Sequence, residues 1–205
     1  MKLLKFLLSF VILLCVACEP DVIGGQKPSG DDVNDTLPVA QYGLEYLYDM
    51  ATLAHITINV AEEDWNDFLS YYDQNPHNEE YIPASFEYEK SGEKFGLDSI
   101  GIRLRGNTSR RRPEGGVGEM HSANGDWHHA HFGVKFDEFV EDQTFCTADR
   151  IYLKWHKDDA NYCREVYSYD LFRRFGVWSA PRACYTSLSV FVEGDEKPVY
   201  MGVYA

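Results

Sequence analysis

The feature that most restricts the fold of this chain is a run of alternating apolar and basic residues, 100–105, that leads into a polar segment, 106–110. Successive side chains of a strand point to opposite faces of a sheet, so its isoleucine and leucine residues would share one face while Arg103 and Arg105 share the other. The run therefore predicts a strand with one buried face. Two guanidinium groups beside a Gly-Asn-Thr-Ser loop, with its peptide N–H groups and hydroxyls, are suited to phosphate oxygens.

The same residues have a plainer interpretation. The chain carries 33 acidic residues, so Arg103 and Arg105 could form ordinary surface ion pairs beside a solvated turn. Three further arginines, 110–112, make this stretch basic within an otherwise acidic chain. That local contrast in charge favours an anion-binding site.

The amino terminus has the layout of a secretory signal peptide, with two lysines, an apolar run and small residues within 1–17. The tetrad Cys15-Val16-Ala17-Cys18 resembles a bacterial lipobox, which predicts cleavage before Cys18 and its acylation. The segment from Glu19 to about Leu37 is rich in Asp, Gly and Pro, which favours an acidic flexible tether over 18–50. We therefore expect a lipid-anchored protein of the bacterial cell envelope, and acidic residues close behind Cys18 favour the outer-membrane surface; a plain secreted protein is the alternative.

Charge limits the partners. Loss of residues 1–17 removes two lysines and no acidic residue, so the formal charge of −14 becomes −16. A surface of this charge repels nucleic acid, and we expect no nucleic-acid partner. The three cysteines beyond Cys18 lack metal-ligand spacing, and three buried thiols is the preferred interpretation, with one disulfide as the alternative. These residues are Cys146, Cys163 and Cys184.

Hydrophobic periodicity predicts an α+β fold, a largely antiparallel sheet with two main helices, in a domain spanning 51–205. Strands are expected at 54–60, 81–88, 95–104, 130–136, 150–154, 182–192 and 199–204. Helices are expected at 61–72 and from Asp158 or Asp159 to about Phe175, where Gly176 would end the second helix. The stripe of this helix consists of Cys163, Tyr167, Leu171 and Phe175.

Two further patterns carry chemistry. Glu165, near the start of the second helix, could reach a lysine on a neighbouring strand, either Lys135 or Lys154, although a solvated helix-end charge is the alternative. His129 and His131 would share one face of a strand. Without a carboxylate or thiol partner they are better explained as polar strand residues than as metal ligands, and we expect no metal site.

Taken together in order and spacing, these segments resemble the amino-terminal part of the CotH family, the spore coat protein H-like atypical protein kinases. The matching stretches are 55–69, 102–109, 134–137, 159–174, 176–182 and 202–204. The resemblance implies a distant kinase-like fold, binding of ATP with Mg, and phosphoryl transfer to secreted or surface proteins. It places in the phosphate-side loop Arg103, Arg105, Gly106, Asn107 and Ser109. It also implies that Glu165 orients a nucleotide-binding lysine, with Lys135 as the candidate.

The chain departs from the family pattern in two places. Histidines 129 and 131 stand where the family has paired lysines, and the family continues beyond the Gly-x-Tyr strand at 202–204 into a region that supplies catalytic and metal-binding carboxylates. The resemblance therefore implies that 51–205 is a truncated amino-terminal portion, inactive in this form and with catalytic residues unknown. The alternative is a non-catalytic surface lipoprotein that binds a protein or a glycan.

Overall fold

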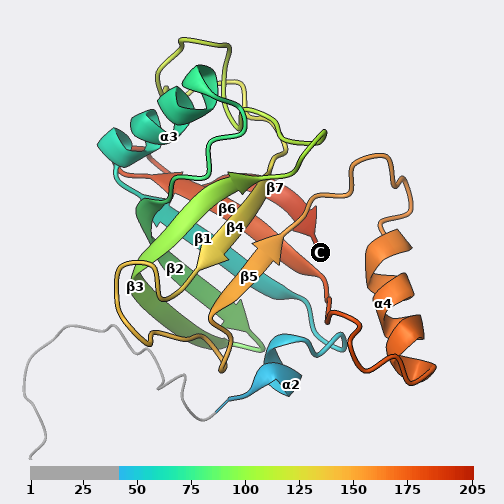
Figure 1. Ribbon diagram of the computed structural model, residues 1–205. Coiled ribbons are helices and arrows are strands. Elements are labelled where there is room, and N and C mark those ends of the chain that lie inside the picture. Colours follow the sequence, from blue (N-terminus) through green and yellow to red (C-terminus); the bar gives the residue numbers. More distant parts are fainter. Residues whose placement is uncertain (1–41) are drawn as a thin grey trace, which may run out of the picture. The chain divides into compact units, whose positions relative to one another are not determined.

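The computed structural model of the protein describes residues 42–205. This part of the chain has an α+β architecture, in which a curled mixed sheet of seven strands carries a few helices (Figure 1). The strand order is β5-β4-β3-β2-β1-β6-β7. The strands are β1 (Ala54–Val60), β2 (Ile82–Lys90), β3 (Glu93–Arg105), β4 (His131–Lys135), β5 (Arg150–Leu153), β6 (Thr186–Val192) and β7 (Val199–Tyr204).

Neighbouring strands are antiparallel at every step except one, the parallel pairing of β1 with β6. Alternation of apolar residues explains the buried face: every second residue of β1, from Ala54 to Val60, is buried. The expectation of a largely antiparallel sheet is therefore confirmed, and the predicted strands all exist. One long crossover through the second main helix carries the chain from β5 to β6.

The sheet curls until its two outer strands approach each other. Trp155, just after β5, forms an antiparallel bridge with Tyr204 at the end of β7. Beside it, the amide of Lys154 donates to the Ala205 carbonyl and the amide of Ala205 donates to the Lys154 carbonyl, each at 2.9 Å. This pairing satisfies backbone groups at the end of an otherwise open edge, and it brings the end of β5 to a fixed place.

Two main helices flank the sheet, α3 (Glu62–Gln74) and α4 (Arg164–Arg174) (Figure 1). Helix α4 begins later than expected, but Asp159 still accepts a hydrogen bond from the Arg164 amide at 2.7 Å. Gly176 ends it as predicted, with φ +79° and a hydrogen bond from its amide to the Arg173 carbonyl at 3.0 Å. Of the α4 residues only Val166 is buried, so the stripe predicted from periodicity is not a core-facing one.

The folded region begins before residue 51. The described part of the expected tether, residues 42–50, contains the short helix α2 (Leu44–Leu47), whose Leu47 is buried. Lys90 of β2 donates to the carbonyl of Tyr46 at 2.8 Å, and the Tyr46 hydroxyl donates to Glu93 at 3.0 Å. The tyrosine side chains of this segment, which lie among acidic residues, pack against the hydrophobic core. The predicted signal peptide, Cys18 and the rest of the tether lie outside the described residues.

Candidate anion-binding site

The end of β3 carries the predicted pair of arginines. Ile102 and Leu104 are buried in the core, while Arg103 and Arg105 lie on the opposite face at the rim of a pocket. The alternation read from the sequence is therefore confirmed. Because β3 is held by β2 on one side and β4 on the other, the backbone beneath both guanidinium groups is fixed.

The loop that follows β3 folds back on itself at Gly106, which has φ +114°. A Cβ atom there would lie 2.7 Å from Ser109 Oγ and 2.9 Å from the Arg110 amide nitrogen, so glycine is required for this turn. Arg110 closes the loop by donating from Nε to the Gly106 carbonyl at 2.9 Å. The polar segment thus forms a compact cradle next to the two β3 arginines.

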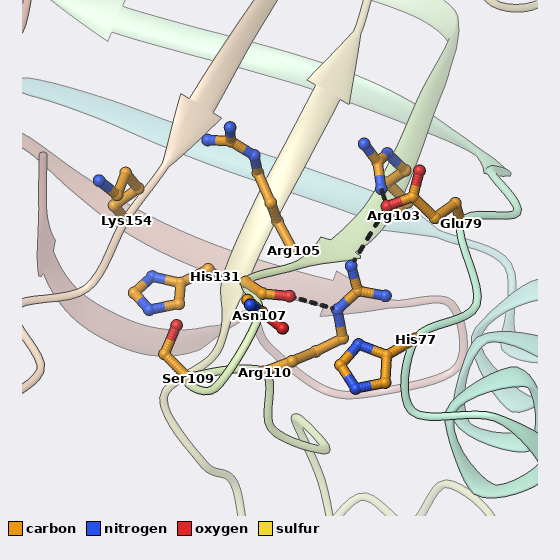
Figure 2. A pocket seen from close by; sticks show the side chains of 10 residues that line it. His77, Glu79, Arg103, Arg105, Asn107, Ser109, Arg110, His131 and Lys154 are labelled. Atoms are coloured by element: carbon orange, nitrogen blue, oxygen red, sulfur yellow. Dashed lines mark hydrogen bonds and ion pairs between the residues drawn. The ribbon is translucent and has the colours of Figure 1, made fainter.

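A pocket of about 500 Å³ lies between this loop, the start of β4, the end of β5 and the loop before β2 (Figure 2). It brings together all five residues assigned to the phosphate-side loop. Its lining consists of His77, Glu79, Arg103, Arg105, Gly106, Asn107, Ser109, Arg110, His131 and Lys154. Four permanent cations against a single lining carboxylate give the pocket a positive charge within an acidic protein.

Lys154 is the lysine that meets Glu165. Its Nζ lies 2.6 Å from Glu165 Oε1 and 2.5 Å from Oε2, so both carboxylate oxygens accept from it. Of the two lysines that the sequence left open, the structure selects this one. The pair joins the end of β5 to the start of α4 and holds the ammonium group at the pocket wall.

Lys135 lies elsewhere. It is the last residue of β4, four positions from His131, which corresponds to about 13 Å along a strand. Its ammonium group pairs with Glu138 at 2.8 Å, and it does not line the pocket. The assignment of Lys135 to the nucleotide site therefore does not fit the geometry. Sequence proximity to the family motif suggested it, but the register of β4 carries it away from the loop.

Arg105 differs from the other cations of the pocket. Its guanidinium carbon lies 3.4 Å from the centroid of the Tyr152 ring, a cation–π contact. The described residues place no carboxylate within 4.0 Å of it, whereas Arg103, Arg110 and Lys154 each have one. The donors of Arg105 are consequently the ones most open to an anion.

His131 forms part of the pocket wall as a neutral group. Burial, and then the charge of Lys154, lower the pKa of His131 to about 4. Its ring packs against Trp155, and its Nδ1 atom is enclosed without a hydrogen-bond partner. At neutral pH it can offer a hydrogen bond to a ligand but no charge.

The three consecutive arginines after the loop separate. Arg110 belongs to the pocket, Arg111 is exposed, and Arg112 is buried, where it forms an ion pair with Asp73 at 2.9 Å. Only the first contributes to the anion site. No signal in the sequence distinguishes the three, because the difference depends on contacts with α3.

Among residues 42–205 no group of three or more His, Cys, Asp or Glu side chains could hold a metal ion. Cys146, Cys163 and Cys184 are free thiols. Cys146 is buried, as expected, but Cys163 at the start of α4 is exposed and Cys184 is half-buried, so the preferred interpretation of three buried thiols holds for Cys146 alone. Cys163 is exposed because α4, which it precedes, buries only Val166.

A second pocket, of about 400 Å³, adjoins the first and shares Arg105 and Lys154 with it. It extends beneath α4 toward the core, and its walls are largely aliphatic and aromatic. Residues that contribute to them include Leu47, Ile56, Tyr88, Leu153, Tyr169 and Cys184. An elongated ligand could place an anionic end in the first pocket and a flat apolar end in the second.

Sequence reasoning missed the contribution of the loop between α3 and β2. His77 and Glu79 line the pocket from this side, and Arg110 donates from Nη1 to the Asn78 carbonyl at 2.7 Å. The segment Asn75-Pro76-His77-Asn78-Glu79 reads only as a turn. Its place in the pocket depends on contacts with residues far away in the sequence, which a local sequence pattern does not predict.

Comparisons of the chain with models of protein families, with curated protein sequences and with solved structures give no match. No helix within residues 42–205 has both the length and the apolar character needed to cross a bilayer.

Proposed function

We propose that the protein is a CotH-like, kinase-related lipoprotein whose folded region binds the phosphate chain of ATP. The observation that carries this proposal is the convergence of Arg103, Arg105, Arg110 and Lys154 on one pocket beside a tight Gly-Asn-Thr-Ser loop. Guanidinium groups and backbone amides are strong donors to phosphate oxygens. The adjoining apolar pocket supports the choice of a nucleotide, because it offers flat, aromatic-lined space next to the cations.

The Lys154–Glu165 pair supports the kinase-related part of the proposal. In protein kinases a lysine on a strand pairs with a glutamate on a helix, and the lysine contacts nucleotide phosphates. Here the lysine follows β5 and the glutamate belongs to α4, with two contacts of 2.5 to 2.6 Å. The resemblance assigned the glutamate, Glu165, but the lysine that pairs with it is Lys154 and not Lys135, the lysine assigned from the motif.

The described residues do not fit the Mg ion that the family implies. The one carboxylate that lines the phosphate pocket, Glu79, is already paired with Arg103 and Arg110, and no further set of carboxylates faces it. Mg prefers several oxygen ligands in octahedral geometry. The proposal for residues 42–205 is therefore nucleotide binding without phosphoryl transfer. Transfer to a secreted protein stays an expectation of the resemblance.

The direct test is calorimetric titration of the purified full chain with ATP and with inorganic tripolyphosphate. Replacement of Arg105 by Gln should weaken both by about tenfold or more, because hydrogen bonds from a charged donor are lost. Arg111→Gln is the matched control, since it removes the same charge from an exposed position in the same segment. Equal affinities of the two variants would contradict the proposal.

We also propose that the protein is anchored in the bacterial cell envelope through lipid on Cys18. The lipobox-like tetrad and the signal-peptide layout support this placement. Incorporation of a radiolabelled fatty acid into the wild-type chain, with loss of label in Cys18→Ser, is the expected result. Label retained by Cys18→Ser would contradict it.

A second candidate function, binding of a surface protein or glycan, is favoured by one observation. The α4 end of the molecule exposes large aromatic side chains, with Trp178 91% and Phe175 79% exposed. Patches of this kind mark interaction sites. Binding of a protein or glycan that is lost in Trp178→Ser but kept in Arg105→Gln would support this function over nucleotide binding.

A further inference from the structure

Glu79 occupies donors that an anionic ligand would need. One of its carboxylate oxygens, Oε1, lies 3.0 Å from Arg103 Nη1 and 3.5 Å from Arg110 Nη2 (Figure 2). The hydrogen bond and charge of Arg103, followed by Arg110, lower the pKa of Glu79, so the group is a carboxylate at neutral pH. It thus fills one end of the basic pocket with a negative charge from the protein itself.

Both arginines have other contacts that hold them in place. Arg110 donates from Nε to the Gly106 carbonyl at 2.9 Å and from Nη1 to the Asn78 carbonyl at 2.7 Å. Arg103 lies over the Tyr81 ring, with its guanidinium carbon 5.4 Å from the ring centroid. Since these contacts do not involve the carboxylate, the two guanidinium groups stay at the pocket when Glu79 moves away.

The Glu79 side chain can move away at little cost. It is 68% exposed, and an ion pair with a carboxylate in contact with water contributes little to stability. The other end of the pocket differs, because Arg105 has no carboxylate partner among the described residues and stacks on Tyr152. The pocket therefore has one open cationic end and one that is filled by an internal anion.

We propose that Glu79 is a specificity-determining residue, which lowers the affinity of the pocket for a chain of phosphates and leaves its affinity for a single phosphate unchanged. This inference rests on the proposed function. A single phosphate binds at Arg105 and leaves Glu79 in place. A ligand with two or more linked phosphates reaches Arg103 and Arg110 as well, and its second anionic group displaces the carboxylate. Only the longer ligand competes with Glu79.

The test compares three probes, namely inorganic phosphate, pyrophosphate and tripolyphosphate, against the full chain and its Glu79→Gln variant by calorimetry at about 0.15 M salt. Tripolyphosphate should bind the variant about fivefold or more tightly than the wild type, because no internal charge must be displaced. The affinity for inorganic phosphate should change less than about twofold.

The matched control is Glu80→Gln, which removes an equal charge from the neighbouring, exposed residue of the same loop. It should change the affinity of every probe less than about twofold, since a solvated charge at this distance is screened. Circular dichroism and thermal unfolding of each variant verify that the fold is intact.

The outcomes separate this inference from the proposed function. Tripolyphosphate binding by the wild type that is unchanged or weaker in Glu79→Gln would overturn the role of Glu79 while leaving the anion site in place. An equal gain in affinity for inorganic phosphate and for tripolyphosphate in Glu79→Gln would overturn the claim that Glu79 acts only on chains of phosphates. Absence of binding of all three probes to the wild type and to Glu79→Gln would overturn both the proposed function and the inference.

Discussion

The two main helices carry similar sequence patterns but have different surroundings. Helix α3 buries three large side chains, Trp65, Phe68 and Leu69, whereas α4 buries Val166 alone. Both segments have apolar and aromatic residues at helical spacing. The comparison teaches that periodicity identifies a helix, while burial of its apolar face depends on what the fold places opposite it.

The partners of α3 come from the sheet and from the long loop after β3. Trp65 stacks on Trp127, with ring centroids 5.3 Å apart, and its indole nitrogen donates to Glu114 at 2.8 Å. Phe68 stacks on Phe132 of β4. Helix α4 instead borders a pocket of about 400 Å³, which Tyr169 and Glu165 help to line. An ion pair between Glu165 and Lys154 joins it to the end of β5.

The largest expected effect is on the α3 side. Trp65→Ala should lower the free energy of unfolding by about 3 to 5 kcal/mol, because it removes a fully buried aromatic side chain and leaves Glu114 without its indole donor. Urea denaturation followed by circular dichroism measures the change. A loss below about 1 kcal/mol would show that α3 is packed no better than α4.

A smaller effect is expected where α4 meets the sheet. Glu165→Gln should lower the free energy of unfolding by about 1 kcal/mol or less, since the pair is partly exposed. Amide hydrogen exchange should rise within α4 and remain unchanged within α3. Asp170→Gln, which breaks an exposed pair with Arg174 on the same helix, is the control and should leave exchange at the start of α4 unchanged. Exchange that rises equally in both helices would contradict the separation.

The α3 side should also respond to pH. His121 bridges Glu114, at 2.9 Å, and Asp195, at 3.3 Å. Burial acts to lower the pKa of His121, but the hydrogen bond and charges of the two carboxylates outweigh burial and raise the pKa above 6.5. A raised pKa in the folded state stabilises the protein fully below pH 6.5, and this contribution is lost as pH rises through the folded-state pKa.

The measurement is the urea midpoint of the wild type and of His121→Gln between about pH 6 and pH 9, the range over which a histidine with a raised pKa loses its proton. The wild type should lose a fraction of a kcal/mol to about 1 kcal/mol more than the variant over this range. His131, whose pKa is about 4, is neutral throughout and does not interfere. Parallel curves for the two proteins would contradict the bridge.

The smallest effect on stability is expected at the exposed end of α4. Trp178→Ser should change the free energy of unfolding by less than about 0.5 kcal/mol, because the side chain is 91% exposed. Binding of a hydrophobic dye to the native protein should fall, since a large part of the apolar surface is removed. A marked loss of stability would mean that this segment is packed against the rest of the chain.

Local patterns predicted most of the fold and part of the site. The alternation at 100–105 placed Arg103 and Arg105 correctly, and the periodicity at 61–72 gave α3, because both depend on neighbours in sequence. The position of Glu79 at the pocket and the pairing of Glu165 with Lys154 instead of Lys135 were not predictable. Both depend on how segments far apart in the sequence are arranged in the fold. Residues 42–50 were expected to belong to the tether because the prediction rested on acidic composition and gave no weight to the aromatic residues that pack on the sheet.

The most direct test of the central claim is the calorimetric titration of tripolyphosphate into the full chain and its Arg105→Gln and Arg111→Gln variants. The account predicts saturable binding to the wild type and to Arg111→Gln, and an affinity about tenfold or more lower in Arg105→Gln. No binding to the wild type, or the same loss in both variants, would contradict the assignment of this pocket to a phosphate chain.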